Sequence, residues 1–158
     1  MYILRNQILM YSNVLSYTAK VRKDDICALL EQIRRKTEVS GYKICGRIIS
    51  TEKKENNEFN EFNDGVIEVE LLVPIDRHSE STAEYKYKSQ FKLLNAVKVR
   101  YEGDICEIRK GVLLLDEYLN ENNLEPITGC YFSYIQAYAD SPESVIADIY
   151  VGINTNVL

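Results

Sequence analysis

The sequence has little of what a metal site or a cysteine-histidine catalytic centre requires. Its 158 residues include no tryptophan, three prolines and a single histidine, His78. A zinc site needs about four clustered cysteine or histidine ligands. The chain has no Cys-x-x-Cys pair, and its cysteines lie far apart, at Cys27, Cys45, Cys106 and Cys130. It also has no glycine-rich phosphate loop. We therefore expect no metal and no cofactor, and we expect the cysteines to be small buried residues.

The sequence also lacks long apolar runs and an excess of positive charge. No apolar segment approaches the roughly 18 residues of a membrane span, and the N-terminus does not resemble a signal peptide. We expect no membrane partner and a cytoplasmic protein with reduced thiols. Nineteen lysines and arginines against 24 acidic residues leave a net charge of −5. This charge argues against direct nucleic-acid binding, which depends on neutralising phosphates.

What the sequence does contain is an internal repeat. Three segments recur at nearly the same offset: 20–22 at 98–100, 25–27 at 104–106, and 69–75 at 147–153. A long period that occurs only twice indicates a pseudo-twofold domain, because solenoids generally need at least three repeats.

Hydrophobic periodicity predicts the same elements in each half. Alternating residues predict strands at 14–22 and 92–99, and apolar residues at helical spacing predict helices that start near Ile26 and Ile105. Gly41 and the segment 122–126 should end these helices, and Asp104 with Glu107 forms a capping box. Further strands are predicted at 43–51, 66–75, 129–139 and 145–153. Polar residues 53–64, which end in an Asp64-Gly65 turn, and 76–90 should form surface connections.

These elements predict an α+β fold in which duplicated βαββ units form one antiparallel sheet with two helices on one face. The whole chain, 1–158, is then a single domain, with repeat 1 at about 12–76, a linker at 77–90 and repeat 2 at about 91–154. One unit alone has too few elements to cover its sheet. We expect Tyr85 and Tyr87 of the linker to be at the surface. For Lys20, Arg22, Lys98 and Arg100, which alternate along matching strands, we expect a solvated face; the alternative is a small basic stripe.

The second half resembles a known family. The segments 97–104, 126–131 and 147–151, in this order, resemble the gyrase-inhibitor-like (GyrI-like) small-molecule-binding domain. This domain is the effector-binding module of AraC- and MerR-type multidrug regulators and also occurs as free-standing bacterial proteins. The resemblance covers roughly residues 12–153, and it implies the free-standing form, without a DNA-binding domain. Asp148 stands where the family usually has a glutamate, and Gly152 where it often has proline. The first half retains both residues of this pattern, as Glu70 and Pro74.

The resemblance implies an aromatic-lined pocket between the halves, often with an acidic residue for cationic, apolar ligands. A carboxylate among rings suits such a cation, because the ring faces add cation–π attraction. The candidate ligand-binding residues are Asp148, Glu70, Tyr134, Tyr150, Tyr17, Tyr138 and Phe132. The alternative for the two carboxylates is that they are ordinary solvent-facing strand residues.

Three functions follow from these residues. The leading one is a module that binds a small organic molecule, apolar or cationic, between the halves. The second is a protein-interaction adaptor, chaperone or inhibitor that presents its sheet edges and tyrosines to a protein partner. The third is a small-molecule hydrolase in which Asp148 and Tyr134 form an acid–base pair. No residue is assigned as catalytic in the leading interpretation.

Overall fold

The computed structural model describes residues 2–53 and 65–154 and shows an α+β protein, as predicted. The first half contains strand β1 (Ile3–Arg22), helix α1 (Ile26–Val39), and strands β2 (Ile49–Glu52) and β3 (Val66–Pro74). The second half contains β4 (Lys86–Gly103), α2 (Arg109–Glu121), β5 (Pro126–Gln136) and β6 (Val145–Ile153). A short 3-10 turn, Lys23–Asp25 or Ile105–Glu107, leads into each helix.

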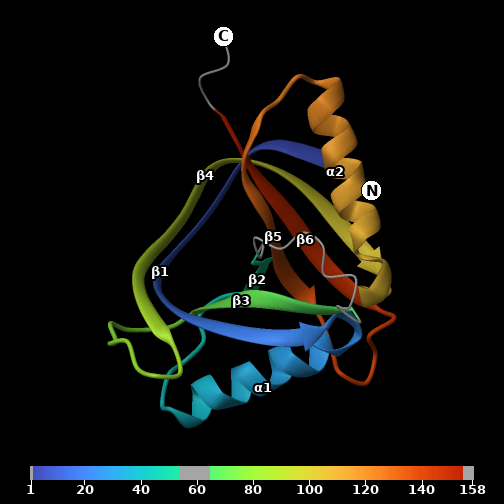
Figure 1. Cartoon of the computed structure of the whole chain (residues 1–158). Coiled ribbons are helices and arrows are strands. Elements are labelled where there is room, and N and C mark those ends of the chain that lie inside the picture. The colour runs from blue at the N-terminus through green and yellow to red at the C-terminus, as the bar shows by residue number, and fades with distance from the viewer. Residues whose placement is uncertain (1, 54–64, 155–158) are drawn as a thin grey trace.

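The six strands form one antiparallel sheet that closes on itself in the order β1-β3-β2-β5-β6-β4. Within each half the order is the same: first strand, third strand, second strand. The halves join where β2 pairs with β5 and where the two long strands, β1 and β4, pair with each other. Both helices lie outside the ring of strands, on the same face of the sheet (Figure 1). The predicted duplicated βαββ arrangement is confirmed.

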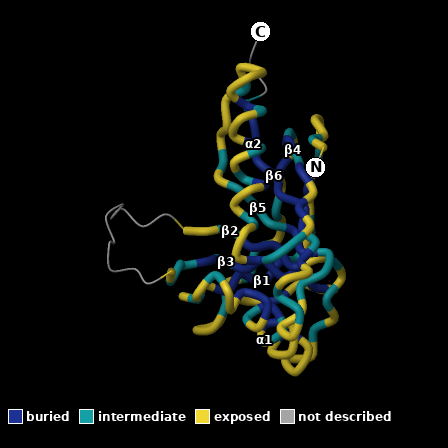
Figure 2. The backbone as a smooth tube through the Cα atoms, turned by 90° about the vertical axis from the view of Figure 1, so that its right-hand side faces the viewer, coloured by how far each residue is buried: buried dark blue, intermediate teal, exposed yellow. Residues whose placement is uncertain are grey.

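The helix-bearing face of the sheet holds two hydrophobic cores, one under each helix. In the α1 core, Leu30 and Ile33 of the helix pack with Leu15 of β1 and Leu71 of β3. In the α2 core, Leu115 and Leu119 pack with residues of β4 and β6, namely Val97, Val99, Ile149 and Val151. In Figure 2 the buried residues follow the strands, while the helices carry exposed residues on their outer sides. The helices therefore form by amphipathic packing onto the sheet.

The opposite face of the sheet, which we call the inner face, carries a third cluster. Leu72 lies between Leu71 and Val73, and Tyr150 lies between Ile149 and Val151, so both point away from the helices. This inner cluster consists of the buried residues Leu9, Val14, Ile49, Leu72, Leu93, Ala96 and Tyr150, with the partly buried rings of Tyr11, Phe91 and Tyr131. Closure of the sheet brings residues from both halves into this one cluster.

The helix ends match the prediction closely. Gly41 follows α1 with a φ of +91°, its N–H bonds to the Glu38 carbonyl, and the N–H of Tyr42 bonds to the Thr37 carbonyl. Asn123, with a φ of +53°, occupies the corresponding position after α2. Both ends are Schellman motifs, which require a residue that tolerates the left-handed region. Asp104 caps the second 3-10 turn by accepting from the Cys106 N–H at 2.8 Å. Glu107 pairs instead with Lys110.

The first strand of each half differs most from the prediction. β1 begins at Ile3, well before the predicted start. Its first part was not predicted because Asn6 and Asn13, with positive φ values of 58° and 59°, interrupt the alternation. Irregular pairing of this kind hides a strand from a search for period two. β4 begins at Lys86, within the segment assigned to the linker, and its polar first residues pair with β1.

Several smaller expectations were wrong. β2 is much shorter than 43–51, and of the residues before it Ile44 forms only an isolated bridge to Ile75. Tyr85 and Tyr87 are partly buried against the α1 core. Among the cysteines, Cys27 is buried, but Cys45 and Cys106 are exposed. Most of the polar connection at 53–64, including Asp64 of its expected turn, lies outside the described residues.

The close approach of α2 to the sheet generates a test of the fold. A Cβ at Gly111 would lie 2.6 Å from Cδ1 of Ile149, a fully buried residue. Gly111→Ala should overpack this contact at a cost of about 1–3 kcal/mol, against a helix-propensity gain of about 1 kcal/mol. Ile149→Val removes that methyl group. The double variant should therefore lose at least about 0.5 kcal/mol less than the sum of the single variants.

Urea unfolding of the four proteins in this cycle measures the coupling. Gly129→Ala is the matched control, because a Cβ at Gly129 meets nothing within 4 Å. Strictly additive losses of unfolding free energy would contradict the close contact between Gly111 of α2 and Ile149.

Candidate functional site

The inner face brings together three of the residues named from the sequence: Asp148, Tyr150 and Glu70. Strand alternation places Asp148 beside Tyr150 on β6 and Glu70 beside Leu72 on β3, all pointing away from the helices. Cross-strand pairing connects them, since Glu70 lies opposite Thr51, Thr51 opposite Tyr131, and Tyr131 opposite Tyr150. A continuous row therefore crosses the junction between the halves.

Asp148 is the centre of a charged network. Its side chain is only 1% exposed, and Arg100, directly opposite on β4, binds it through Nε–Oδ1 at 2.9 Å and Nη2–Oδ2 at 3.2 Å. Arg47 Nη1 lies 3.3 Å and Lys98 Nζ 3.7 Å from Oδ2. The hydrogen bonding of Arg100 to the Asp148 carboxylate is the main reason why the pKa of Arg100 is raised. Lys98 and Arg100 are thus ion-pair partners, and the expectation of a merely solvated face was wrong for them.

Glu70 has a separate pair of partners. Its Oε2 accepts from the hydroxyl of Ser16 and from Lys88 Nζ at 3.0 Å, and its side chain is 18% exposed. Burial acts to raise the pKa of Glu70, but the hydrogen bonds from Ser16 and Lys88 outweigh it, so the pKa is lowered. Asp148 and Glu70 are therefore each matched by the protein's own cations.

The sheet register makes these two carboxylates unequal. Asp148 lies opposite Arg100 on β4, whereas Glu70 lies opposite Thr18 on β1. Arg22, which the sequence repeat aligned with Arg100, pairs with Val66 instead. The tripeptide repeat therefore does not mark equivalent positions of the sheet, and only the second half has an arginine across from its carboxylate.

Aromatic rings lie between the two charged networks. Phe91 and Tyr131 meet edge to face with centroids 5.2 Å apart, and Lys98 Nζ lies 5.8 Å from the centroid of Tyr150. A Cβ at Gly46 would lie 2.6 Å from the ring of Tyr11, so a glycine there gives this ring its space. Burial is the main cause that raises the pKa of Tyr11, Tyr131 and Tyr150. Their hydroxyls stay neutral at pH 7 and the rings act as apolar surfaces with polar tips.

Leu72 and Tyr150 are both buried, 2% and 7% exposed. The inner face beside Asp148 is therefore packed with side chains, and the partly buried Tyr11, Phe91 and Tyr131 form its rim.

The structure places the other named residues elsewhere. Tyr17, Phe132 and Tyr134 lie on the helix-bearing face, in or against the α1 core. Tyr134 exchanges a 2.8 Å hydrogen bond with Ser50, and burial raises its pKa strongly. Because Asp148 points to the opposite face, the structure does not bring these two residues together as an acid–base pair. Tyr138 follows β5 and is 54% exposed.

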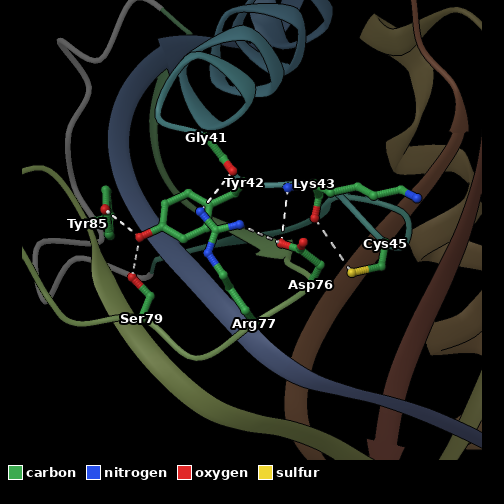
Figure 3. Close-up of polar contacts among 8 residues, drawn as sticks. All are labelled: Gly41, Tyr42, Lys43, Cys45, Asp76, Arg77, Ser79 and Tyr85. Atoms are coloured by element: carbon green, nitrogen blue, oxygen red, sulfur yellow. Dashed lines mark hydrogen bonds and ion pairs between the residues drawn. The ribbon is translucent and has the colours of Figure 1, made fainter.

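A second polar cluster lies at the end of α1 (Figure 3). The hydroxyl of Tyr42 contacts Ser79 and Tyr85, and the Ser79 hydrogen bond is the main cause that lowers the pKa of Tyr42. Arg77 lies 4.5 Å from the centroid of the Tyr42 ring and donates to the Gly41 carbonyl at 2.8 Å. These contacts fasten the connection between the halves to the end of α1, which is a structural role.

Within residues 2–53 and 65–154, no three histidine, cysteine, aspartate or glutamate side chains group as metal ligands. None of the described helices is both long and apolar enough to span a membrane.

The sequence did not mark the rim rings or Arg47 as site residues, and it gave Lys98 and Arg100 no partner. Tyr11 lies before the first predicted strand, Arg47 lies in the predicted strand 43–51 without a role, and Phe91 lies at the edge of the segment taken as linker. Tyr131 lies in a predicted strand, 129–139, but was not among the candidate site residues. The one signal in the sequence was that Tyr131 and Ser133 lie on the same side of their strand. This parity does not show which residues lie opposite Tyr131, because that depends on the register of the sheet.

Comparison with solved structures shows which fold this is. The chain superposes on the C-terminal domain of EcmrR with a TM-score of 0.69 at 13% identity, covering 98% of this chain and 99% of that one. The chain has the gyrase-inhibitor-like fold. EcmrR in a complex with DNA gives a TM-score of 0.72 at 15% identity. That match covers 94% of this chain but 57% of the EcmrR chain, so the protein spans a little over half of its length.

A hydrolase from Listeria innocua also has this fold, with a TM-score of 0.61, 13% identity, and coverage of 97% of this chain and 91% of that one. No protein-family model and no curated protein matches the sequence. The gyrase-inhibitor-like fold thus rests on structural likeness, and function has to be argued from the site.

The Asp148 network predicts a large effect on stability. Asp148→Asn leaves Arg47, Lys98 and Arg100 crowded around a neutral amide. We expect a loss of about 3 kcal/mol, the low end for breaking a buried ion pair, because the two arginines are half exposed. Glu107→Gln, which breaks the exposed Lys110 pair, is the control and should change stability by less than about 1 kcal/mol. Equal effects in urea unfolding would contradict the buried network.

Glu70 predicts a pH dependence. Its pKa in the folded state lies below the ordinary value of 4.5, so the ionised form contributes stability above pH 4.5. That contribution is lost as the pH falls from 4.5 through the lowered pKa. Glu70→Gln should therefore show a shallower loss of unfolding free energy between pH 5 and about pH 3 than the wild type. NMR titration of the Glu70 side chain gives a direct check, and a pKa at or above 4.5 would rule the mechanism out.

Proposed function

We propose that the protein binds a small organic molecule with an aromatic or other flat apolar group, at the rim of the inner cluster. The observation that carries the proposal is the set of three partly buried rings, Tyr11, Phe91 and Tyr131, held between two charged networks. Apolar rings with a few convergent polar groups are the usual composition of a small-molecule site.

The rim is suited to a flat ligand because its rings are held in place. The ring of Tyr11 lies so close to Gly46 that a Cβ there would clash with it, and Phe91 and Tyr131 contact each other edge to face. Rings that are fixed before binding lose little conformational entropy when a ligand packs on them. The inner face next to these rings is filled with side chains. The ligand therefore packs on the rim, and a ring has to move only if the ligand enters the inner cluster.

The same fold occurs in the C-terminal domain of the EcmrR chain that is seen with DNA. The gyrase-inhibitor-like domain that the sequence resembles is an effector-binding module, and the proposal extends that role to this chain on the strength of the rim. The site candidates retained from the sequence are Asp148, Glu70 and Tyr150, and the rim rings are added to them.

A protein-interaction function is the second candidate, on a different surface. Ile8 and Met10 of β1 and Leu94 of β4 are 62%, 54% and 62% exposed. Because β1 and β4 pair in this region, these side chains come from neighbouring strands. Large exposed apolar residues on adjacent strands favour contact with a protein partner.

Substitution of the rim rings tests the ligand proposal. Phe91→Leu and Tyr131→Leu should each weaken binding of a naphthalene-based probe about fivefold, because each removes a ring face worth roughly 1 kcal/mol. Tyr138→Leu removes an exposed ring outside the rim and should leave affinity unchanged. Isothermal titration calorimetry measures the affinities, and circular dichroism confirms that each variant folds.

Loss of binding in Tyr138→Leu alone would move the site to the connection between β5 and β6. Absence of any binding by the wild type at millimolar probe would reject the ligand function. The exposed residues of β1 and β4, untouched by these variants, would then support the protein-interaction function.

A further inference from the structure

The charges around Asp148 bear on the chemical class of the ligand. Three cations, Arg47, Lys98 and Arg100, lie within 4 Å of this one carboxylate, so the network carries an excess of positive charge. Glu102 also acts on Arg100, but it is the weakest of the influences that raise the pKa of that arginine. A cationic ligand would meet a carboxylate that is already neutralised, in a field of its own sign.

From this imbalance, and resting on the proposed function, we propose that the ligand carries an anionic group, such as a carboxylate or phosphate, bound by Arg47 and Arg100. The overall charge of −5 does not attract such a ligand, so the attraction has to be local.

The two arginines are placed to do this. Their side chains are 47% and 48% exposed, although Asp148 between them is 1% exposed. Arg47 reaches Asp148 through Nη1 alone, so its guanidinium offers further N–H donors to an incoming group. Arginine binds carboxylates and phosphates through two parallel hydrogen bonds. Asp148 holds both guanidinium groups in position before a ligand arrives.

The aromatic rim lies next to these donors. The charge of Arg47 acts to lower the pKa of both Tyr11 and Tyr150, and the charge of Arg100 acts in the same direction on Tyr150, so these rings lie near the arginines. A ligand whose flat group packs on the rim can therefore place an anionic substituent at the arginines. An aryl carboxylate or aryl phosphate has the required shape and charge.

Three probes with the same ring system separate charge from shape: 1-naphthoate, neutral 1-naphthamide and cationic 1-naphthylmethylammonium. At low ionic strength, 1-naphthoate should bind at least tenfold more tightly than the amide, and the cation more weakly than either. Added salt should weaken only the preference for the anion. Isothermal titration calorimetry measures the three affinities.

Arg47→Gln should abolish the preference for 1-naphthoate. It should still fold, because Arg100 keeps its two bonds to Asp148. Arg77→Gln is the matched control: Arg77 also pairs with one aspartate, at 3.4 Å, and is 49% exposed, but lies at the end of α1. It should retain the preference.

The failures of the two proposals are distinguishable. Equal affinity for the three probes, or tightest binding of the cation, would overturn the anion proposal and leave the ligand function standing. A preference that survives Arg47→Gln would overturn the assignment to these arginines. Absence of binding by all three probes would overturn both proposals.

Discussion

Closure of the six-stranded sheet is the constraint on which the rest of the structure depends. Pairing of β1 with β4 and of β2 with β5 leaves one face for the helices and encloses the other. An open sheet would place Leu72 and Tyr150 at a solvated surface. In the closed one they are buried, and residues from both halves share a single inner cluster. The site is therefore a consequence of how the halves join.

Burial of Asp148 follows from that closure and explains the cations around it. A carboxylate that is 1% exposed loses its hydration and needs partners, and Arg100, Arg47 and Lys98 supply them from β4 and from the segment before β2. Glu70 satisfies the same requirement with fewer partners because it is less buried. Positive charge in excess of what Asp148 requires, next to apolar rings, gives this face a chemical preference that the net charge of the chain does not reveal.

Much of the fold could be predicted because its signals are local. Helical spacing and the residues that tolerate a left-handed conformation, Gly41 and Asn123, determine the two helices and their ends. Alternation predicted β3 and β6 closely and placed Asp148 beside Tyr150 on one face. The extended starts of β1 and β4 were not predicted, because irregular pairing near Asn6 and the positive φ values of Asn6 and Asn13 disturb β1, and the first residues of β4 are polar.

The sequence by itself determined most of the elements, their duplicated order and the parity of residues in the regular strands, since these depend on interactions between residues near in the chain. Tertiary structure alone decided the register: Asp148 faces Arg100, whereas Glu70 faces Thr18 despite the repeat. It also separated Tyr134 from Asp148 and brought Arg47 and Tyr11 to the site. Register and closure depend on contacts between distant segments, and a short repeated pattern is compatible with more than one such pairing.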